Sequence, residues 1–237
     1  MSKITDSKQK DFIDSSKVGN WKVKVFGVGS IGSNLIKQLA LTGFKDITAY
    51  DFDTVDEENL GSQEFDMTHL GMKKTEAIQK LMKDHYDYPV KIVEGKIEEA
   101  TTLSPDADTI YFCGFDSLEA RNMLWKKLKR FPVVWMESRI GRDQQRFYVL
   151  DLRNPDPLWL QDYEVSLDPE GPRTELTCGE KGTYGSNSEL VAKIVRQMVN
   201  IAENKPFITM YIGAWGTPGS IYRMSNQEAP LENQVDN

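Results

Sequence analysis

Residues 21–32 are WKVKVFGVGSIG, a short β-rich run that ends in a cluster of glycines. The apolar segment SNLIKQLALT follows at 33–42 and is typical of a helix, and Gly43 is placed to end it. DITAYDFD, at 46–53, has the composition of a second strand. A strand, a helix and a strand within roughly 30 residues match the size of a parallel βαβ unit. The segment around Gly27–Gly32 therefore predicts the start of a parallel sheet.

The rest of the chain continues this alternation of strands and helices. Strand-like apolar runs that alternate with helices predict an α/β fold, a Rossmann-like doubly wound and mainly parallel sheet. After about residue 140 the pattern changes, and RFYVLDL at 146–152 predicts an antiparallel strand in a smaller C-terminal lobe. The expected segments are an N-terminal arm (1–20), a Rossmann-like core (21–150), a crossover loop (151–182), a C-terminal helix with strands (183–224) and a disordered tail (225–237).

Composition excludes several classes of protein. The chain has 237 residues and a mass of 27.0 kDa, and its 29 Lys and Arg against 36 Asp and Glu leave a formal charge of −7. This acidic balance argues against broad nucleic-acid binding. No apolar run approaches the ~20 residues of a membrane helix, and the polar start lacks the apolar core of a signal peptide. Because Cys113 and Cys178 are the only cysteines, we expect a cytoplasmic protein with no disulfide framework and no zinc.

The glycines themselves indicate a ligand. Gly27, Gly29 and Gly32 form a GxGxxG pattern between the first strand and the helix. In such a pattern the first glycine permits a tight turn, the second lets phosphate approach the backbone, and the third lets helix and strand pack closely. Free amides and the helix dipole then attract phosphate. Asp51 ends the second strand, where an acid binds ribose hydroxyls. The 21–150 core is therefore predicted to bind a nucleotide, either ATP or a nicotinamide dinucleotide.

Three further blocks follow in order: Asp51–Val55, which leads to Asn59–Gln63, then Gly71–Lys74, then Asp116–Asn122. With the glycine pattern they resemble the motifs of the ThiF/MoeB family, prokaryotic relatives of the ubiquitin-activating enzymes: GxGxxG, DxDxVxxxNLxRQ, GxxK and DxxxxRN. The resemblance covers roughly residues 20–150. It implies an adenylyltransferase that uses ATP to activate the C-terminus of a small ubiquitin-like protein or peptide and releases pyrophosphate, and it favours a homodimer.

The resemblance also implies the site residues. Asp51 would bind the ribose, Asn59 and Lys74 the phosphates, and Asp116 a magnesium ion that positions the triphosphate. Attack by an ionised carboxylate needs positioning and charge neutralisation rather than a general base. Lys74 and Asp116 are thus the predicted catalytic residues, with Cys178 a candidate for a later transfer step. The residues predicted to contact the nucleotide are Gly27, Gly29, Ser30, Ile31, Gly32, Asp51, Asp53, Asn59, Ser62, Lys74 and Asp116.

The chain departs from the family pattern at Ser62, where NLxRQ has an arginine. An arginine at a transferring phosphate can contribute about 10³–10⁵ in rate. Lys73, Arg139, Arg142 or a partner chain are the candidates to supply this charge. Two other interpretations therefore stay open. One is a catalytically weak or inactive nucleotide-binding scaffold, and the other is a NAD-dependent oxidoreductase built on the same βαβ unit.

Four features also have purely structural interpretations. Asp116 suits a helix cap, and Arg121 suits a structural pairing as well as it suits a contact with the nucleotide. Cys113 lies in an apolar strand and is expected to be buried and inert. The apolar stripe of residues 188–204 has helical spacing and is expected to face the core, although it is wide enough for a dimer interface.

Overall fold

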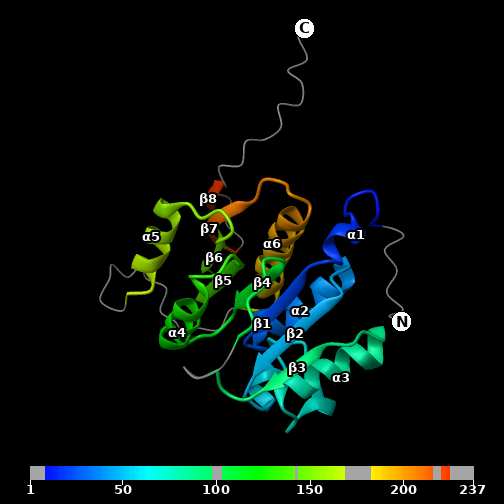
Figure 1. Ribbon diagram of the computed structural model, residues 1–237. Helices are drawn as coiled ribbons and strands as arrows, with labels where there is room; N and C mark the ends of the chain where they lie inside the picture. The colour runs from blue at the N-terminus through cyan, green and yellow to red at the C-terminus, as the bar shows by residue number, and fades with distance from the viewer. Residues whose placement is uncertain (1–8, 98–102, 142–143, 169–182, 216–219, 225–237) are drawn as a thin grey trace.

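The computed structural model describes residues 9–97, 103–141, 144–168, 183–215 and 220–224. Within them the strands form one eight-stranded sheet of order β3-β2-β1-β4-β5-β6-β7-β8 (Figure 1). The strands are β1 (Lys22–Phe26), β2 (Asp46–Asp51), β3 (Lys91–Glu94), β4 (Thr109–Cys113), β5 (Val134–Gly141), β6 (Gln144–Asp151), β7 (Ile208–Ala214) and β8 (Ser220–Met224). The α-helices are α1 (Ser15–Val18), α2 (Ser30–Thr42), α3 (Lys74–Tyr86), α4 (Leu118–Leu128), α5 (Pro157–Ser166) and α6 (Tyr184–Ala202), and two 3₁₀ turns are η1 (Glu57–Asn59) and η2 (Met67–His69).

The first five strands of the chain form the parallel half of the sheet. β1 pairs in parallel with both β2 and β4, while β3 pairs with β2 and β5 with β4. Every residue of β4 is buried, as expected for a strand covered on both faces. Because the order reverses direction between β1 and β4, their carboxyl ends flank a crevice, which is where open α/β sheets bind ligands. The predicted Rossmann-like fold is confirmed.

The antiparallel half begins where the pattern of the sequence changes. β6 runs antiparallel to β5, and β7 and β8 continue in the same way. The antiparallel strand predicted at 146–152 is confirmed as β6, and the C-terminal strands extend the parallel sheet rather than forming a separate one. One short helix, α5, follows β6 within the segment predicted as a crossover loop.

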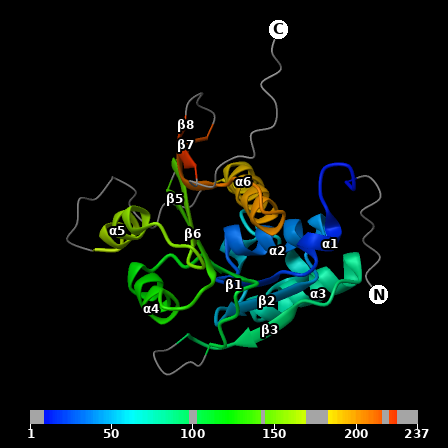
Figure 2. The same cartoon turned by 45° about the horizontal axis from the view of Figure 1, so that its top comes forward.

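Helices cover both faces of the sheet (Figure 2). On one face α2, α3 and α6 pack over inward residues such as Val25 and Ile110, and on the other α4 and α5 pack over Tyr111 and Trp135. The apolar stripe of α6 is buried within the chain against α2 and β6, so its core interpretation is confirmed. None of the helices in the described part of the chain has the length and hydropathy that crossing a bilayer requires.

Some predicted features lie outside the described residues. These are the start of the N-terminal arm (1–8), residues 169–182 of the predicted crossover loop with Cys178, the position of Arg142, and the predicted tail (225–237). The described end of the arm is anchored, because Asp14 caps α1 and its backbone N–H donates to Glu203 Oε1 at 2.8 Å, next to the end of α6.

Gly32→Ala is expected to lower the free energy of unfolding by about 1–3 kcal/mol, because a Cβ at Gly32 would lie 1.8 Å from the carbonyl oxygen of Gly27. Gly29→Ala is the matched control, since a Cβ there meets nothing within 4 Å and its φ of −79° suits alanine. Its stability should fall by less, about 0.5–1 kcal/mol, because alanine is a poorer N-cap than glycine. Denaturant titration measures both variants, and equal stabilities would contradict the packing argument.

Candidate functional site

The glycine turn connects β1 to α2 by a close backbone approach. Gly27 has a φ of +92°, which favours glycine, and a Cβ there would lie 3.0 Å from the backbone of Gly114, just after β4. Gly32, in the first turn of α2, packs so closely on the Gly27 carbonyl that a Cβ there would lie 1.8 Å from its oxygen. Gly29 is the N-cap of α2 and has no side chain to bond the free amides. The N-terminus of α2 therefore presents unpaired N–H groups beside open space, which is the arrangement that binds phosphate.

Asp51 ties this turn to the end of β2. Its Oδ2 accepts a 2.6 Å hydrogen bond from the backbone N–H of Val28, and its Oδ1 accepts one from Asp53 at 2.8 Å. Asp51 as a whole is only 8% exposed. It is thus held rigidly beside the glycine turn, and its oxygens retain lone pairs for a ligand hydroxyl.

Lys74 and Asn59 approach the same space from the segment after β2. The Lys74 ammonium lies 3.1 Å from Asp53 Oδ2 and is largely buried, although a first-turn lysine is usually solvated. Asn59 Oδ1 accepts from the backbone N–H of Asp56, which closes a capping box around η1. The Nδ2 amide of Asn59 has no hydrogen-bond partner within the described residues, so its donors are available to a ligand.

One cavity of about 380 Å³ collects nearly all of the predicted residues. Every residue of the predicted nucleotide set except Gly32 lines it. Gly32 instead serves the packing of α2, as the third glycine of the pattern should. The predicted residues in its wall are Gly27, Gly29, Ser30, Ile31, Asp51, Asp53, Asn59, Ser62, Lys74 and Asp116.

A second cavity of about 830 Å³ adjoins the first. The two cavities share Asp51, Phe52, Phe115 and Asp116 in their walls. Beyond these residues the second cavity is lined by the apolar side chains of Ile97, Ala120 and Met123, together with polar and charged groups. Asp51 therefore stands between a cavity suited to phosphate and one whose wall includes apolar side chains.

The far wall of the first cavity was not fully predicted. It contains Arg121 of α4 and Ser138, Arg139 and Ile140 of β5, roughly 90–110 residues after the glycine turn. Arg139 was expected only as one of several candidate cations. Gln63 also lines the cavity, and its Oε1 is buried without a partner within the described residues. The signal for Gln63 was its place inside the Asn59–Gln63 block.

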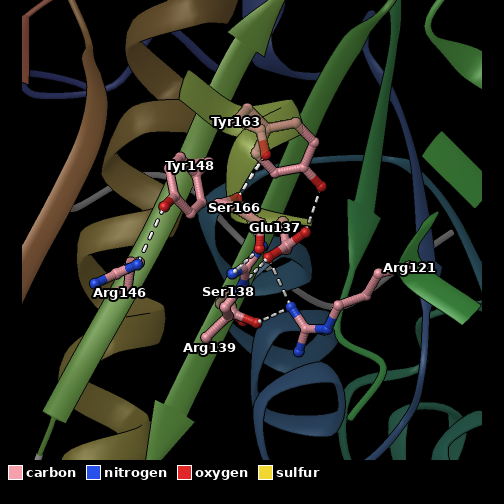
Figure 3. A network of polar contacts seen from close by, with 8 residues as sticks. All are labelled: Arg121, Glu137, Ser138, Arg139, Arg146, Tyr148, Tyr163 and Ser166. Carbon is pink, nitrogen blue, oxygen red and sulfur yellow. Dashed lines mark hydrogen bonds and ion pairs between the residues drawn. The ribbon is translucent and has the colours of Figure 1, made fainter. Parts of the chain in front are cut away.

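A fully buried carboxylate, Glu137, organises this wall (Figure 3). Arg121 lies 2.8 Å from Glu137 Oε1, Arg139 Nε donates to the same oxygen, and the Tyr163 hydroxyl donates to Oε2. Burial by itself would raise the pKa of Glu137, but the two guanidinium groups and the hydroxyl hold that pKa below its ordinary value. Glu137 is therefore an anion at neutral pH.

Of the candidate cations for Ser62, only some reach the cavity. Lys73 is exposed and its Nζ donates to the carbonyl of Phe52 at 3.0 Å, so it is not part of the wall. Arg139 is part of the wall. Arg121, for which a structural pairing and a nucleotide contact were both expected, pairs with Glu137 of β5 and also lines the cavity.

Asp116 is the candidate ligand for a metal ion in this site. No group of three or more His, Cys, Asp or Glu side chains among the described residues is arranged to hold a metal ion by itself. Magnesium usually binds through one or two carboxylates together with substrate phosphates. Asp116 is exposed, lines both cavities, and has no hydrogen-bond or ion-pair partner in the described part of the chain. A single carboxylate beside a phosphate site fits magnesium brought in with a nucleotide.

The fold and the glycine turn define a Rossmann-like α/β protein, and comparison with known proteins defines its family. The ThiF family model matches residues 7–199, so the chain belongs to the ThiF family and the predicted resemblance is confirmed. The chain is 33% identical over 161 residues to the NEDD8-activating enzyme E1 catalytic subunit of Schizosaccharomyces pombe, covering 64% of this chain and 35% of that protein. It is 27% identical over 212 residues to the adenylyltransferase and sulfurtransferase UBA4 of Vanderwaltozyma polyspora, covering 83% and 47%. The chain thus spans about half the length of these relatives or less.

Solved structures share the fold. E. coli MccB with ATP has a TM-score of 0.66 at 16% identity, over 88% of this chain and 65% of that one. PaaA has a TM-score of 0.67 at 16% identity, over 92% and 68%. At this identity the similarity establishes the architecture and not the activity.

Cys113 is expected to resist alkylation in the folded protein. The thiol is fully buried, and burial raises its pKa to about 12, so almost no thiolate exists at pH 8. In a Cys178→Ser background, which leaves one cysteine, iodoacetamide should modify the protein at pH 8 only after denaturant is added. Mass spectrometry detects the adduct. Rapid labelling of the native protein would show that this strand is accessible.

Proposed function

We propose that this chain adenylates the C-terminal carboxylate of a small ubiquitin-like protein or peptide, using ATP with magnesium and releasing pyrophosphate. The observation that carries the proposal is the single cavity that collects the glycine turn, Asp51, Asn59, Lys74 and Asp116. Membership of the ThiF family supports it. The names of the relatives, a NEDD8-activating enzyme and an adenylyltransferase, support it as well. The crystal structures of E. coli MccB with ATP and with MccA are consistent with it.

The wall of the cavity suggests how the nucleotide would lie. The nucleoside would sit at Asp51 and extend into the second cavity, because Asp51 separates the two spaces. The phosphates would lie over the free amides of α2, within reach of Lys74 and of the Asn59 amide. Magnesium, held by Asp116 and the phosphates, would neutralise charge as the pyrophosphate leaves.

The chemistry needs no general base in the protein. A carboxylate oxygen of the partner attacks the α-phosphorus, the bond from that phosphorus to the β-phosphate oxygen breaks, and an acyl adenylate and pyrophosphate result. The partner's carboxylate is already ionised at neutral pH. The residues of the cavity therefore act by positioning the partner's carboxylate against the α-phosphate and by stabilising the charge that spreads in the transition state.

The assembly and setting of the chain belong to the same proposal. We expect a homodimer that forms through a surface other than the apolar stripe of α6, because that stripe is covered within the chain. A cytoplasmic setting agrees with a buried free thiol at Cys113. The absence of zinc and any role of Cys178 in a later transfer remain predictions.

Exchange of radiolabelled pyrophosphate into ATP tests the function. The probes are small ubiquitin-like proteins with a C-terminal Gly-Gly and short peptides with a free C-terminal carboxylate. Exchange should require magnesium and a free carboxylate, so the same peptides with an amidated C-terminus are the control. ATP binding without exchange for any carboxylate would favour the inactive scaffold, and binding of NAD in place of ATP would favour the oxidoreductase.

Lys74→Ala is expected to lower pyrophosphate exchange about a hundredfold or more, because one preorganised donor to the reacting phosphates contributes roughly 3–4 kcal/mol. The fold should survive, since Asp53, the partner of Lys74, is half-exposed and becomes solvated. Lys80→Ala, on the solvent side of the same helix, is the control and should retain parent activity. Unchanged exchange in Lys74→Ala would remove this lysine from the site.

Asp116→Asn is expected to weaken ATP binding in the presence of magnesium but not in EDTA, because the change removes an anionic oxygen ligand from a hard cation. Isothermal titration under both conditions measures the difference. Asp106→Asn, on the surface at the opposite end of β4, is the control. If Asp116→Asn binds magnesium-ATP as tightly as the parent, the proposed metal position is wrong.

A further inference from the structure

Two buried arginines share one buried carboxylate in the wall of the nucleotide cavity. Glu137 is completely buried, and the side chains of Arg121 and Arg139 are 5% and 11% exposed. Both guanidinium groups bond to the same oxygen of Glu137, while the other oxygen accepts from Tyr163 (Figure 3). This cluster, Arg121–Glu137–Arg139, holds two positive charges and one negative charge. It therefore carries a surplus of one positive charge where charges are rarely left unbalanced.

The remaining donors fix the two guanidinium groups in place. Arg139 donates to the backbone carbonyl and to the hydroxyl of Ser166 in α5, each at 3.0 Å. Arg121 donates to the carbonyl of Ser138 at 2.8 Å. Its Nε is buried and has no hydrogen-bond partner within the described residues. An arginine of this kind is rigid and has bonding capacity left, which is costly unless a ligand or water uses it.

The surplus positive charge of the cluster faces a cavity whose other walls carry acidic side chains. Both arginines line it, and so do the carboxylates of Asp51, Asp53, Asp56, Glu58 and Asp116. The other cation in the described part of the wall, Lys74, is already paired with Asp53. The cluster is therefore the one part of the described wall that offers positive charge without an equal negative charge beside it.

We propose that the Arg121–Glu137–Arg139 cluster is the phosphate-binding charge of this cavity, in which Glu137 is a positioning residue that fixes both arginines and cancels the charge of only one. The surplus charge binds the polyphosphate of the nucleotide and compensates within the same chain for the uncharged side chain at Ser62. The inference rests on the proposed function and specifies which cation serves it. A rigid guanidinium suits this role because it forms strong charge-assisted hydrogen bonds to phosphate.

Arg139→Met is the test variant, because it leaves Arg121 and Glu137 as a balanced pair. Replacement of Glu137 would instead leave two buried cations without an anion and would risk the fold. Isothermal titration with AMP, ADP and ATP, each with magnesium, should show affinity losses that grow with the number of phosphates. We expect a loss of about tenfold or more for ATP and less than about twofold for AMP.

Two further variants control the experiment. Arg139→Lys keeps the charge and should recover most of the ATP affinity. Arg153→Met makes the same chemical change at Arg153, which pairs with Asp151 at the end of β6 away from this cavity, and should bind all three nucleotides like the parent. Circular dichroism establishes that each variant is folded. If Arg139→Met does not fold, Arg139→Gln replaces it under the same criteria.

The outcomes separate this inference from the proposed function. Parent-like ATP affinity in Arg139→Met would show that the cluster is only structural and would overturn the inference, while adenylation would stand. An equal loss for AMP and ATP would also overturn it, because the contact would then not be with the added phosphates. If the parent protein itself binds no ATP, the proposed function is wrong, and the inference that rests on it is overturned with it.

Discussion

The contact between the first turn of α2 and the carbonyl of Gly27 determines where the parts of the site lie. A Cβ at Gly32 would lie 1.8 Å from that oxygen, so the helix starts as close to the β1 end as two backbones allow. Its unpaired amides therefore open directly over the strand ends. Asp51 holds the same turn from β2 through the Val28 amide, and Gly27 packs on Gly114 after β4. Strands β1, β2 and β4 therefore end at the same place. Asp116 lies there because it follows the end of β4 by only three residues.

This dependence explains which parts could be predicted from the sequence. The glycine turn and Asp51 belong to one local βαβ unit, whose spacing is set by backbone geometry, so their residues could be read in sequence order. The alternation of apolar strands and helices predicted the sheet for the same reason. The buried state of Lys74 could not be predicted, because first-turn lysines are normally solvated and its burial depends on the path of the Asp53–Lys74 segment. Gln63 lay in the predicted block, yet its orphaned oxygen is visible only in the folded chain.

The places of Arg121 and Arg139 in the wall of the cavity could not be predicted from any local sequence pattern. Arg139 reaches the cavity because β5 pairs with β4 in a register that sets Glu137 opposite Cys113, at the end of β4. Glu137 lies in the run VVWMES. A strand covered by helices on both faces of the sheet is expected to be apolar, so a carboxylate at this position conflicts with the surrounding pattern. Such a conflict is stable only if partners from other elements satisfy the charge. Here they come from α4, from β5 itself and from α5, which are separated in sequence by up to 42 residues between Arg121 and Tyr163.

The charge balance of the cavity bears on the difference between an enzyme and a scaffold. A polyphosphate brings several negative charges to a wall that already carries five carboxylates, and the Lys74–Asp53 pair is neutral before the ligand arrives. Magnesium offsets part of this charge, and binding to the amides of α2 offsets part through dipoles. A fixed cation that lies where charge develops would add to the stabilisation of the transition state that magnesium and the helix dipole supply. We infer that the Arg121–Glu137–Arg139 cluster supplies such a fixed cation, because contacts with Glu137 and Ser166 hold the guanidinium groups in place. The absence of an arginine at position 62 therefore does not by itself imply a scaffold, since Arg121 and Arg139 line the same cavity as Ser62 and are candidates for the charge that the proposed adenylation requires.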